Sequence, residues 1–221
     1  MDSIGIIGGA GPTAGAYLFQ KIVAICQQKY GCERDSDFPR IILLSYPFSD
    51  MLGDQVNKHL INIQLQEAID CLISNKITVG AIACNTLHGF LPPKIDGLKL
   101  VHIIEVTKEY LETNNWKNPL ILCSSTAAKN QLHAKYFTCH YPDLFTQKII
   151  DDLIDAVTAG CCLEKASSKL SSLIGEDQVA VLGCTELSVI HESKPLSHSK
   201  ICNPNHLLAE EICKLAFQIN V

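Results

Sequence analysis

Residues 81–86 read AIACNT, and about a hundred residues later residues 180–186 read AVLGCTE. In both segments an apolar run typical of a buried parallel strand ends on a cysteine, with a threonine close behind it. The repeat predicts two structural halves that face each other across a cleft, each supplying one thiol, Cys84 and Cys184. Two proton carriers on opposite sides suit a reaction that removes a proton from one face of a carbon and returns one to the other face.

The rest of the chain alternates between strand and helix patterns. Continuous apolar strands in such an alternation indicate parallel sheets covered by helices on both faces, and therefore an α/β fold. We expect strands at 4–8, 40–46, 78–84, 99–103, 119–123, 178–183 and near Ile201, and helices at 12–30, 56–75, 126–137, 151–157, 163–174 and from Pro204 onward.

The pattern restarts near residue 105. After each cysteine segment the chain passes a proline-containing turn, then a further strand and a helix. This indicates an internal duplication with one lobe over residues 1–104 and a second over residues 105–202. We expect the closing helix, within residues 203–221, to return to the first lobe.

Composition excludes several classes of protein. The chain has 221 residues, of which 47% are apolar, and a net charge of −5 without a basic block, which argues against nucleic-acid binding. No apolar run reaches the roughly 18 residues that a membrane helix needs, and no signal segment precedes the strand expected from Ser3. We expect a soluble, cytosolic protein. The eleven cysteines include no Cys-x-x-Cys and no zinc-finger spacing, so we expect reduced thiols and no metal.

Cys84 and Cys184 fall where ligands bind to parallel sheets, beyond the carboxyl ends of the strands. A helix start after each cysteine would offer free N–H groups and lower the pKa of the thiol from about 8.5 toward 7. A thiolate near neutral pH is a usable general base, and the protonated partner is a usable acid. The alternative is a pair of cysteines that are only small core residues.

Polar residues follow both thiols. Asn85, Thr86 and Thr185 could bind a substrate carboxylate with their N–H groups and side chains, or could simply cap helices. Glu186 lies in the first turn of an expected helix, where the helix dipole favours a carboxylate. It could therefore bind the substrate or have only a structural role. His88 could orient a neighbour or titrate near the site.

The loop GGAGPTA at residues 8–14 fits a loose phosphate-binding fingerprint, which makes a nicotinamide-dependent dehydrogenase one alternative. The next strand lacks the acidic residue that would bind a ribose, and the first candidate is Asp50. Gly9 and Gly11 could instead let a small substrate approach the backbone closely.

Taken together, residues 8–12, 83–88 and 183–186 resemble the three signatures of the aspartate/glutamate racemase family, and the resemblance spans nearly the whole chain. It implies two pseudo-symmetric, Rossmann-like lobes with the active site in the inter-lobe cleft, frequent dimers, and racemisation of amino acids without pyridoxal phosphate or another cofactor. It further implies that Cys84 and Cys184 are the acid/base pair, that Asn85, Thr86 and Thr185 surround the substrate α-carboxylate, and that Thr126 lies in the second-lobe loop.

Two positions depart from the aspartate-specific pattern. Met51 stands at the position where the aspartate-specific pattern has an arginine, and Thr158 stands where that pattern has a lysine. A side-chain carboxylate would lose a charge-assisted contact worth roughly 1.5–3 kcal/mol. A glutamate-preferring or broad-specificity racemase therefore fits as well as an aspartate enzyme.

Other functions remain open on the same fold. The resemblance extends to hydantoin racemases, decarboxylases and cis–trans isomerases with similar cysteine loops. A protein that only binds an amino acid is the alternative from a different class, although binding alone gives no reason for a thiol on each lobe.

Overall fold

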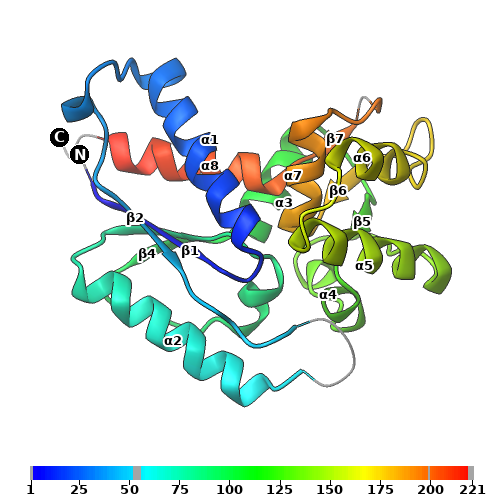
Figure 1. Ribbon diagram of the computed structural model, residues 1–221, viewed down its shortest axis with the longest axis horizontal. Coiled ribbons are helices and arrows are strands. Elements are labelled where there is room, and N and C mark those ends of the chain that lie inside the picture. Colours follow the sequence, from blue (N-terminus) through cyan, green and yellow to red (C-terminus); the bar gives the residue numbers. More distant parts are fainter. Residues whose placement is uncertain (1, 52–55, 199, 219–221) are drawn as a thin grey trace.

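Two parallel sheets lie side by side in the computed structural model, which describes residues 2–51, 56–198 and 200–218 (Figure 1). Each strand pairs with its neighbours in parallel register. The first sheet has the order β2-β1-β3-β4, with β1 (Ile4–Gly8), β2 (Ile41–Ser45), β3 (Val79–Ile82) and β4 (Lys99–Val101); the second has the order β5-β6-β7, with β5 (Leu120–Leu122), β6 (Ala180–Leu182) and β7 (Ile201–Cys202). The predicted α/β class with parallel sheets is confirmed.

Helices cover both faces of the first sheet. The helices are α1 (Pro12–Tyr30), α2 (Lys58–Ser74), α3 (Ile103–Thr113), α4 (Ser125–Lys129), α5 (Leu144–Thr158), α6 (Leu163–Ser171), α7 (Thr185–Ser193) and α8 (Pro204–Phe217). α1 and α8 lie on one face of the first sheet and α2 on the other (Figure 1). α8 packs against α1, α3, β3 and β4, while the division of the chain into lobes at residues 104 and 203 stays a prediction.

The two sheets share part of their hydrophobic core. Ile4 and Leu18 from the first sheet and its helix belong to the same buried cluster as Ile121 and Val181 from the second sheet. This contact joins the halves on the side of α1 and α8. In the part of the chain that the structure describes, no helix combines the length and the apolar character needed to cross a bilayer.

Local signals explain where the helices begin. Pro12 and Pro204 stand in the first turns of α1 and α8, where a proline's missing N–H group costs no helical hydrogen bond. The side chains of Asn57, Asp143 and Asn203 accept backbone N–H bonds at the starts of α2, α5 and α8. These features place the helix starts from short-range sequence alone.

The expectation of one helix over residues 126–137 is wrong. α4 ends at Lys129, Gln131 takes a left-handed backbone conformation (φ +48°), and only a short 3₁₀ turn, His133–Lys135, follows. The phenolic oxygen of Tyr141 accepts hydrogen bonds from the N–H groups of His133 and Ala134. Those two N–H groups are thus bound by a side chain of a later segment, so the helix does not continue.

α5 is longer than expected. It begins at Leu144 rather than near residue 151, because the carboxylate of Asp143 accepts the N–H group of Thr146 at 2.8 Å and caps an earlier turn. Leu144 and Phe145 in that turn are largely exposed, so the turn lacks the periodic apolar pattern by which a helix is recognised.

Candidate active site

Both predicted thiols line one cavity. Cys84 lies two residues beyond the end of β3, and Cys184 lies two residues beyond the end of β6. The cavity has a volume of about 340 Å³, which is within the range of small-molecule sites. Its other described lining residues are Gly9, Ala10, Gly11, Pro12, Phe48, Ser49, Asp50, Met51, Thr86, Ser124, Ile154, Asp155, Thr158 and Glu186. The structure thus brings the two cysteines together, while their catalytic role stays a prediction.

The glycine loop forms one wall of this cavity. Gly9 and Gly11 have φ angles of +97° and +88°, which side chains rarely tolerate. A Cβ atom on Gly9 would lie 1.9 Å from the carbonyl oxygen of Tyr46, and one on Gly11 would lie 1.6 Å from Oε1 of Glu186. The close approach that these glycines permit is therefore to groups of the protein itself, and the role in substrate binding stays a prediction.

Glu186 is a buried carboxylate beside the thiols. Its Oε2 accepts a hydrogen bond from Sγ of Cys184 at 2.9 Å and lies 3.3 Å from Oγ1 of Thr185, whose one hydroxyl proton it shares with the carbonyl of Ala83. Burial raises the pKa of Glu186 above its usual range, against the effect of these hydrogen bonds. A carboxylate held this close to a thiol can receive the thiol proton.

The expectation of thiols with lowered pKa values is wrong for this structure. Burial, followed by the charge of Glu186, raises the pKa of Cys84 to about 12, and the N–H groups of Leu87 and Thr86 offset this only in part. Burial and Glu186 also hold the pKa of Cys184 well above its usual range. The segment after Cys84 is a short 3₁₀ turn, Thr86–Phe90, rather than an α-helix with a strong dipole.

Glu186→Gln is expected to lower the pKa values of both cysteines, because a nearby negative charge disfavours a thiolate and the amide removes that charge. The measurement is the pH dependence of alkylation at Cys84 and Cys184, followed by peptide mass spectrometry. Glu192→Gln is the control, since Glu192 lies on the same helix but pairs with Lys21. Unchanged profiles in Glu186→Gln would contradict this electrostatic account.

The predicted carboxylate-binding residues lie in different surroundings. Thr86 lines the cavity, with its hydroxyl 3.1 Å from that of Ser124. Asn85 is buried, and its Oδ1 lies 3.4 Å from Nε2 of His133. Thr185 donates its hydroxyl to the carbonyl of Ala83 at 3.1 Å, across the two halves. Of these three predicted residues, only Thr86 is among the described lining of the cavity, and their role in binding stays a prediction.

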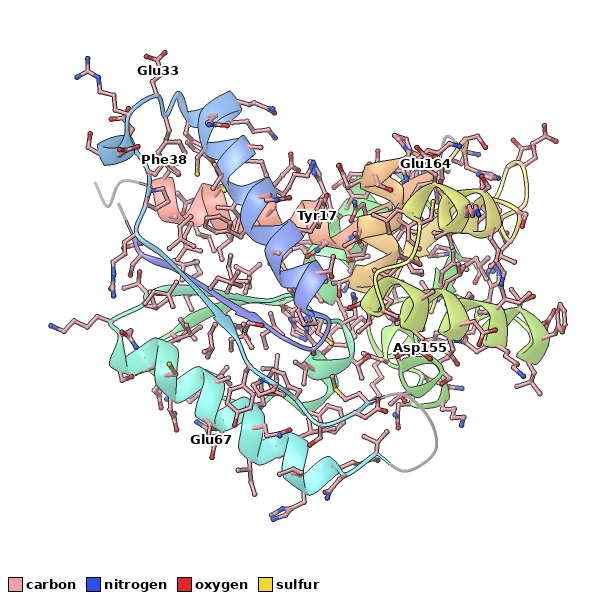
Figure 2. All side chains as sticks on the ribbon, viewed as in Figure 1. Tyr17, Glu33, Phe38, Glu67, Asp155 and Glu164 are labelled. Atoms are coloured by element: carbon pink, nitrogen blue, oxygen red, sulfur yellow. The ribbon has the colours of Figure 1, made fainter. Side chains whose placement is uncertain are left out.

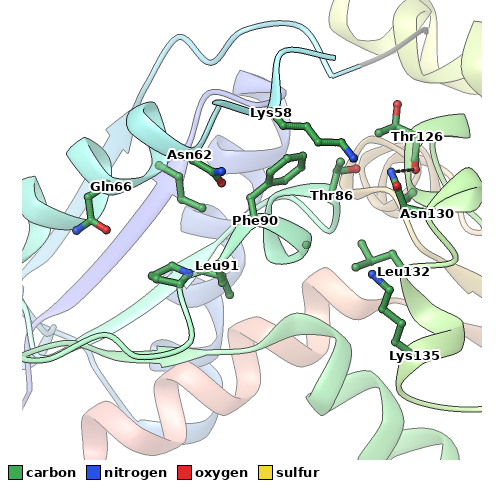
Figure 3. A pocket seen from close by; sticks show the side chains of 14 residues that line it. Lys58, Asn62, Gln66, Thr86, Phe90, Leu91, Thr126, Asn130, Leu132 and Lys135 are labelled. Carbon is green, nitrogen blue, oxygen red and sulfur yellow. Dashed lines mark hydrogen bonds between the residues drawn. The ribbon is translucent and has the colours of Figure 1, made fainter. Parts of the chain in front are cut away.

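Thr126 lies at a neighbouring and larger cavity of about 550 Å³. Lys58 and Lys135 extend into this second cavity beside Thr86 and Asn130 (Figure 3). Thr86 lines both cavities, but neither cysteine lines the larger one. Thr126 itself donates its hydroxyl to the carbonyl of Met51, which joins the second-half loop to the segment after β2.

His88 orients the backbone at Cys84 rather than titrating there. Its Nδ1 lies 2.8 Å from the carbonyl oxygen of Cys84, and its Nε2 accepts the N–H group of Ile103 at 3.3 Å. The second bond requires Nε2 to be unprotonated, so Nδ1–H is the donor to Cys84. Burial lowers the pKa of His88 to about 3, which keeps the ring neutral at physiological pH.

Sequence reasoning did not assign Ser124 or Asp155 to the site, and it considered Asp50 only as a possible ribose partner. Ser124 caps α4, Asp50 follows β2, and Asp155 lies at the end of α5 nearer the first sheet (Figure 2). The helical spacing gave a usable signal for Asp155, because it lies three residues before Thr158 and so on the same face of the helix. Met51 and Thr158, the two positions that depart from the aspartate pattern, both line the cavity.

Comparisons with known proteins agree with the resemblance seen in the motifs. The chain is 22% identical over 218 residues to the broad-specificity amino-acid racemase RacX of Bacillus subtilis, covering 90% of this chain and 93% of the relative. No family model matches the chain.

Solved structures show the same fold. Aspartate racemase of Picrophilus torridus superposes with a TM-score of 0.75 at 24% identity, over 98% of this chain and 94% of the other. Glutamate racemase of Campylobacter jejuni superposes with a TM-score of 0.65 at 18% identity, over 99% and 87%. The predicted resemblance to aspartate/glutamate racemases is confirmed by sequence and by fold.

Proposed function

We propose that the protein is a cofactor-independent amino-acid racemase in which Cys84 and Cys184 act as the acid/base pair. The observation that carries this proposal is the meeting of two thiols, one from each sheet, on a single cavity. The amino-acid racemases that resemble the chain in sequence and in fold support the reaction type. A protein that only bound an amino acid would need neither thiol.

The proposed reaction starts from a buried thiol pair. Cys184 passes its proton to Glu186, which lies at hydrogen-bonding distance, and the resulting thiolate removes the α-proton of the substrate. Cys84 then gives its own proton to the opposite face of the carbanion. One turnover leaves Cys184 as a thiol and Cys84 as a thiolate, and the other enantiomer reacts with the roles exchanged.

Substrate binding would make thiolate formation easier. The α-ammonium group of a substrate that lies between the sulfurs places a positive charge next to both thiols, which favours their ionised forms. The N–H groups of Thr86 and Leu87 already point toward Cys84 and stabilise its thiolate. We propose that Thr86, with Asn85 and Thr185 behind it, holds the α-carboxylate. Fixed N–H donors in a cavity that excludes water would stabilise the carbanion.

Exchange of the α-proton with solvent tests this function. In deuterated water, incubation with L- or D-amino acids is expected to replace the α-proton by deuterium as the enantiomer forms, without release of carbon dioxide. A decarboxylase would release carbon dioxide, and a hydantoin racemase would leave free amino acids unchanged. A binding protein would show saturable binding without exchange.

Dinucleotide binding is disfavoured by a specific contact. The buried carboxylate of Glu186 lies against Gly11, where a pyrophosphate would approach the loop. Two negative groups at that spot would repel each other. A dehydrogenase would also bind a nicotinamide nucleotide, so absence of such binding would dismiss this alternative.

We further propose that the protein is a cytosolic homodimer whose substrate, an amino acid, is a small molecule. The family resemblance supports the dimer, and light scattering coupled to size-exclusion chromatography measures the mass directly.

A further inference from the structure

The cavity that Cys84 and Cys184 line, here called the thiol cavity, has apolar walls from both halves of the chain. Ile154 of α5 lines it, is only 4% exposed, and belongs to the buried apolar cluster against which Cys184 packs. Phe48 and Met51, from the segment after β2, are half-buried and pack against the cluster that contains Cys84. Each thiol therefore lies with an apolar cluster that also supplies a wall of the cavity.

The acidic residues that line the cavity besides Glu186 are exposed to solvent. These residues are Asp50 and Asp155. Carboxylates at exposed positions stay hydrated, and exposed ion pairs contribute little to affinity. Thr158, which is also exposed, donates its hydroxyl to the carbonyl of Ile154 within α5. The polar part of the lining is therefore a weak partner for a charged substrate side chain.

The lining offers no cation to an acidic side chain. No lysine, arginine or histidine is among the described lining residues, and the residues outside the described ranges contain none of these types in the sequence. Met51 and Thr158, at the two positions that depart from the aspartate-specific pattern, bring no charge. A side-chain carboxylate would thus lose hydration without gaining a counter-ion, which weakens binding.

Resting on the racemase function proposed above, we propose that the substrate is an amino acid with an apolar side chain, such as leucine, methionine or norleucine. Its α-carbon would lie between the two sulfurs, and its side chain would contact Phe48, Met51 and Ile154. Transfer of apolar surface from water to such walls favours binding, whereas burial of an unpaired charge opposes it.

A homologous series of substrates tests the apolar contact. Alanine, 2-aminobutyrate, norvaline and norleucine differ by one methylene group at each step. We expect kcat/KM for α-proton exchange in deuterated water to rise about fourfold per step, because burial of a methylene group favours binding by about that factor. A flat or falling series would overturn the proposal while leaving the racemase function in place.

Two pairs of substrates test the effect of charge. Leucine and aspartate have side chains with the same number of non-hydrogen atoms, and we expect kcat/KM to be at least about tenfold higher for leucine. Lysine carries an ammonium group at the end of the norleucine side chain, and we expect it to react no faster than norleucine. Equal rates for leucine and aspartate, or a preference for lysine over norleucine, would overturn the proposal.

Variants assign the preference to the cavity wall. Met51→Gln is expected to lower the ratio of the norleucine to the alanine kcat/KM about fivefold, because the amide replaces an apolar contact by a group that must lose water. Leu60→Gln is the control, since Leu60 is a 39% exposed apolar residue of α2 that is not among the lining residues, so the ratio should be unchanged. A ratio that stays constant in Met51→Gln, or falls equally in both variants, would reject the assigned contact.

Calorimetric binding separates failure of this proposal from failure of the racemase function. If no amino acid exchanges its α-proton but leucine binds more tightly than aspartate, the racemase function fails and the substrate class stands. If aspartate binds as tightly as leucine, or if neither binds, the substrate class fails.

Discussion

Cys84→Ser and Cys184→Ser are each expected to lower racemisation roughly a thousandfold or more, in both directions. General acid/base groups contribute about 10²–10⁴ to rates, and a serine hydroxyl is a far weaker acid than a thiol. In the proposed scheme each direction of the reaction needs one thiolate and one thiol, so loss of either sulfur affects both enantiomers. The measurement is polarimetric or chromatographic racemisation of the substrate that exchanges fastest.

The control for this experiment is Cys162→Ser. Cys162 is an exposed free cysteine just before α6 and does not line the thiol cavity, so its replacement should leave the rate unchanged. Substantial racemisation by either Cys84→Ser or Cys184→Ser would rule out the two-thiol scheme. Equal losses of activity in all three variants would instead indicate that the fold is sensitive to the replacement of any cysteine.

Gly11→Ala is expected to lower the rate about a hundredfold. The new Cβ atom would lie 1.6 Å from Oε1 of Glu186, so this buried carboxylate has to move away from its present contact with Cys184. Displacement of a catalytic group by about 1 Å can cost on the order of 10² in rate. The left-handed conformation adds a stability cost of about 1–2 kcal/mol for a residue with a side chain.

Gly31→Ala separates these two effects. Gly31 has a φ angle of +67° at the end of α1, but a Cβ atom there would meet nothing within 4 Å. Urea unfolding should therefore show a conformational cost in both variants, whereas only Gly11→Ala should lose activity. If the two variants kept equal activity, the contact between the glycine loop and Glu186 would not matter for the reaction.

The elements with strong local signals could be predicted from the sequence. The bounds of α1 follow from Gly11 and Pro12 at its start and Gly31 at its end, and the structure has the same first and last residues. Apolar runs identified the central strands, β3 and β6, and so placed both cysteines at strand ends. The repeat of the cysteine segment then predicted one cavity for both cysteines, because equivalent positions in two halves that face each other can lie close together.

Features that depend on distant contacts could not be predicted. Tyr141 ends the helical segment after α4 by binding N–H groups from a later part of the chain. The raised pKa values of the thiols result from burial and from Glu186, which a motif-based argument about helix starts does not include. Asp50 and Asp155 lie far apart in the sequence, and only the fold brings them to one cavity.

The hydrogen bond from Thr185 to the carbonyl of Ala83 limits how the enzyme can adapt to larger ligands. It ties the segment just after β6 to the segment just after β3, next to the core that both sheets share. Separation of the halves at that depth would break this bond and expose apolar side chains. This bond therefore restricts changes in the spacing between the two segments that carry Cys84 and Cys184.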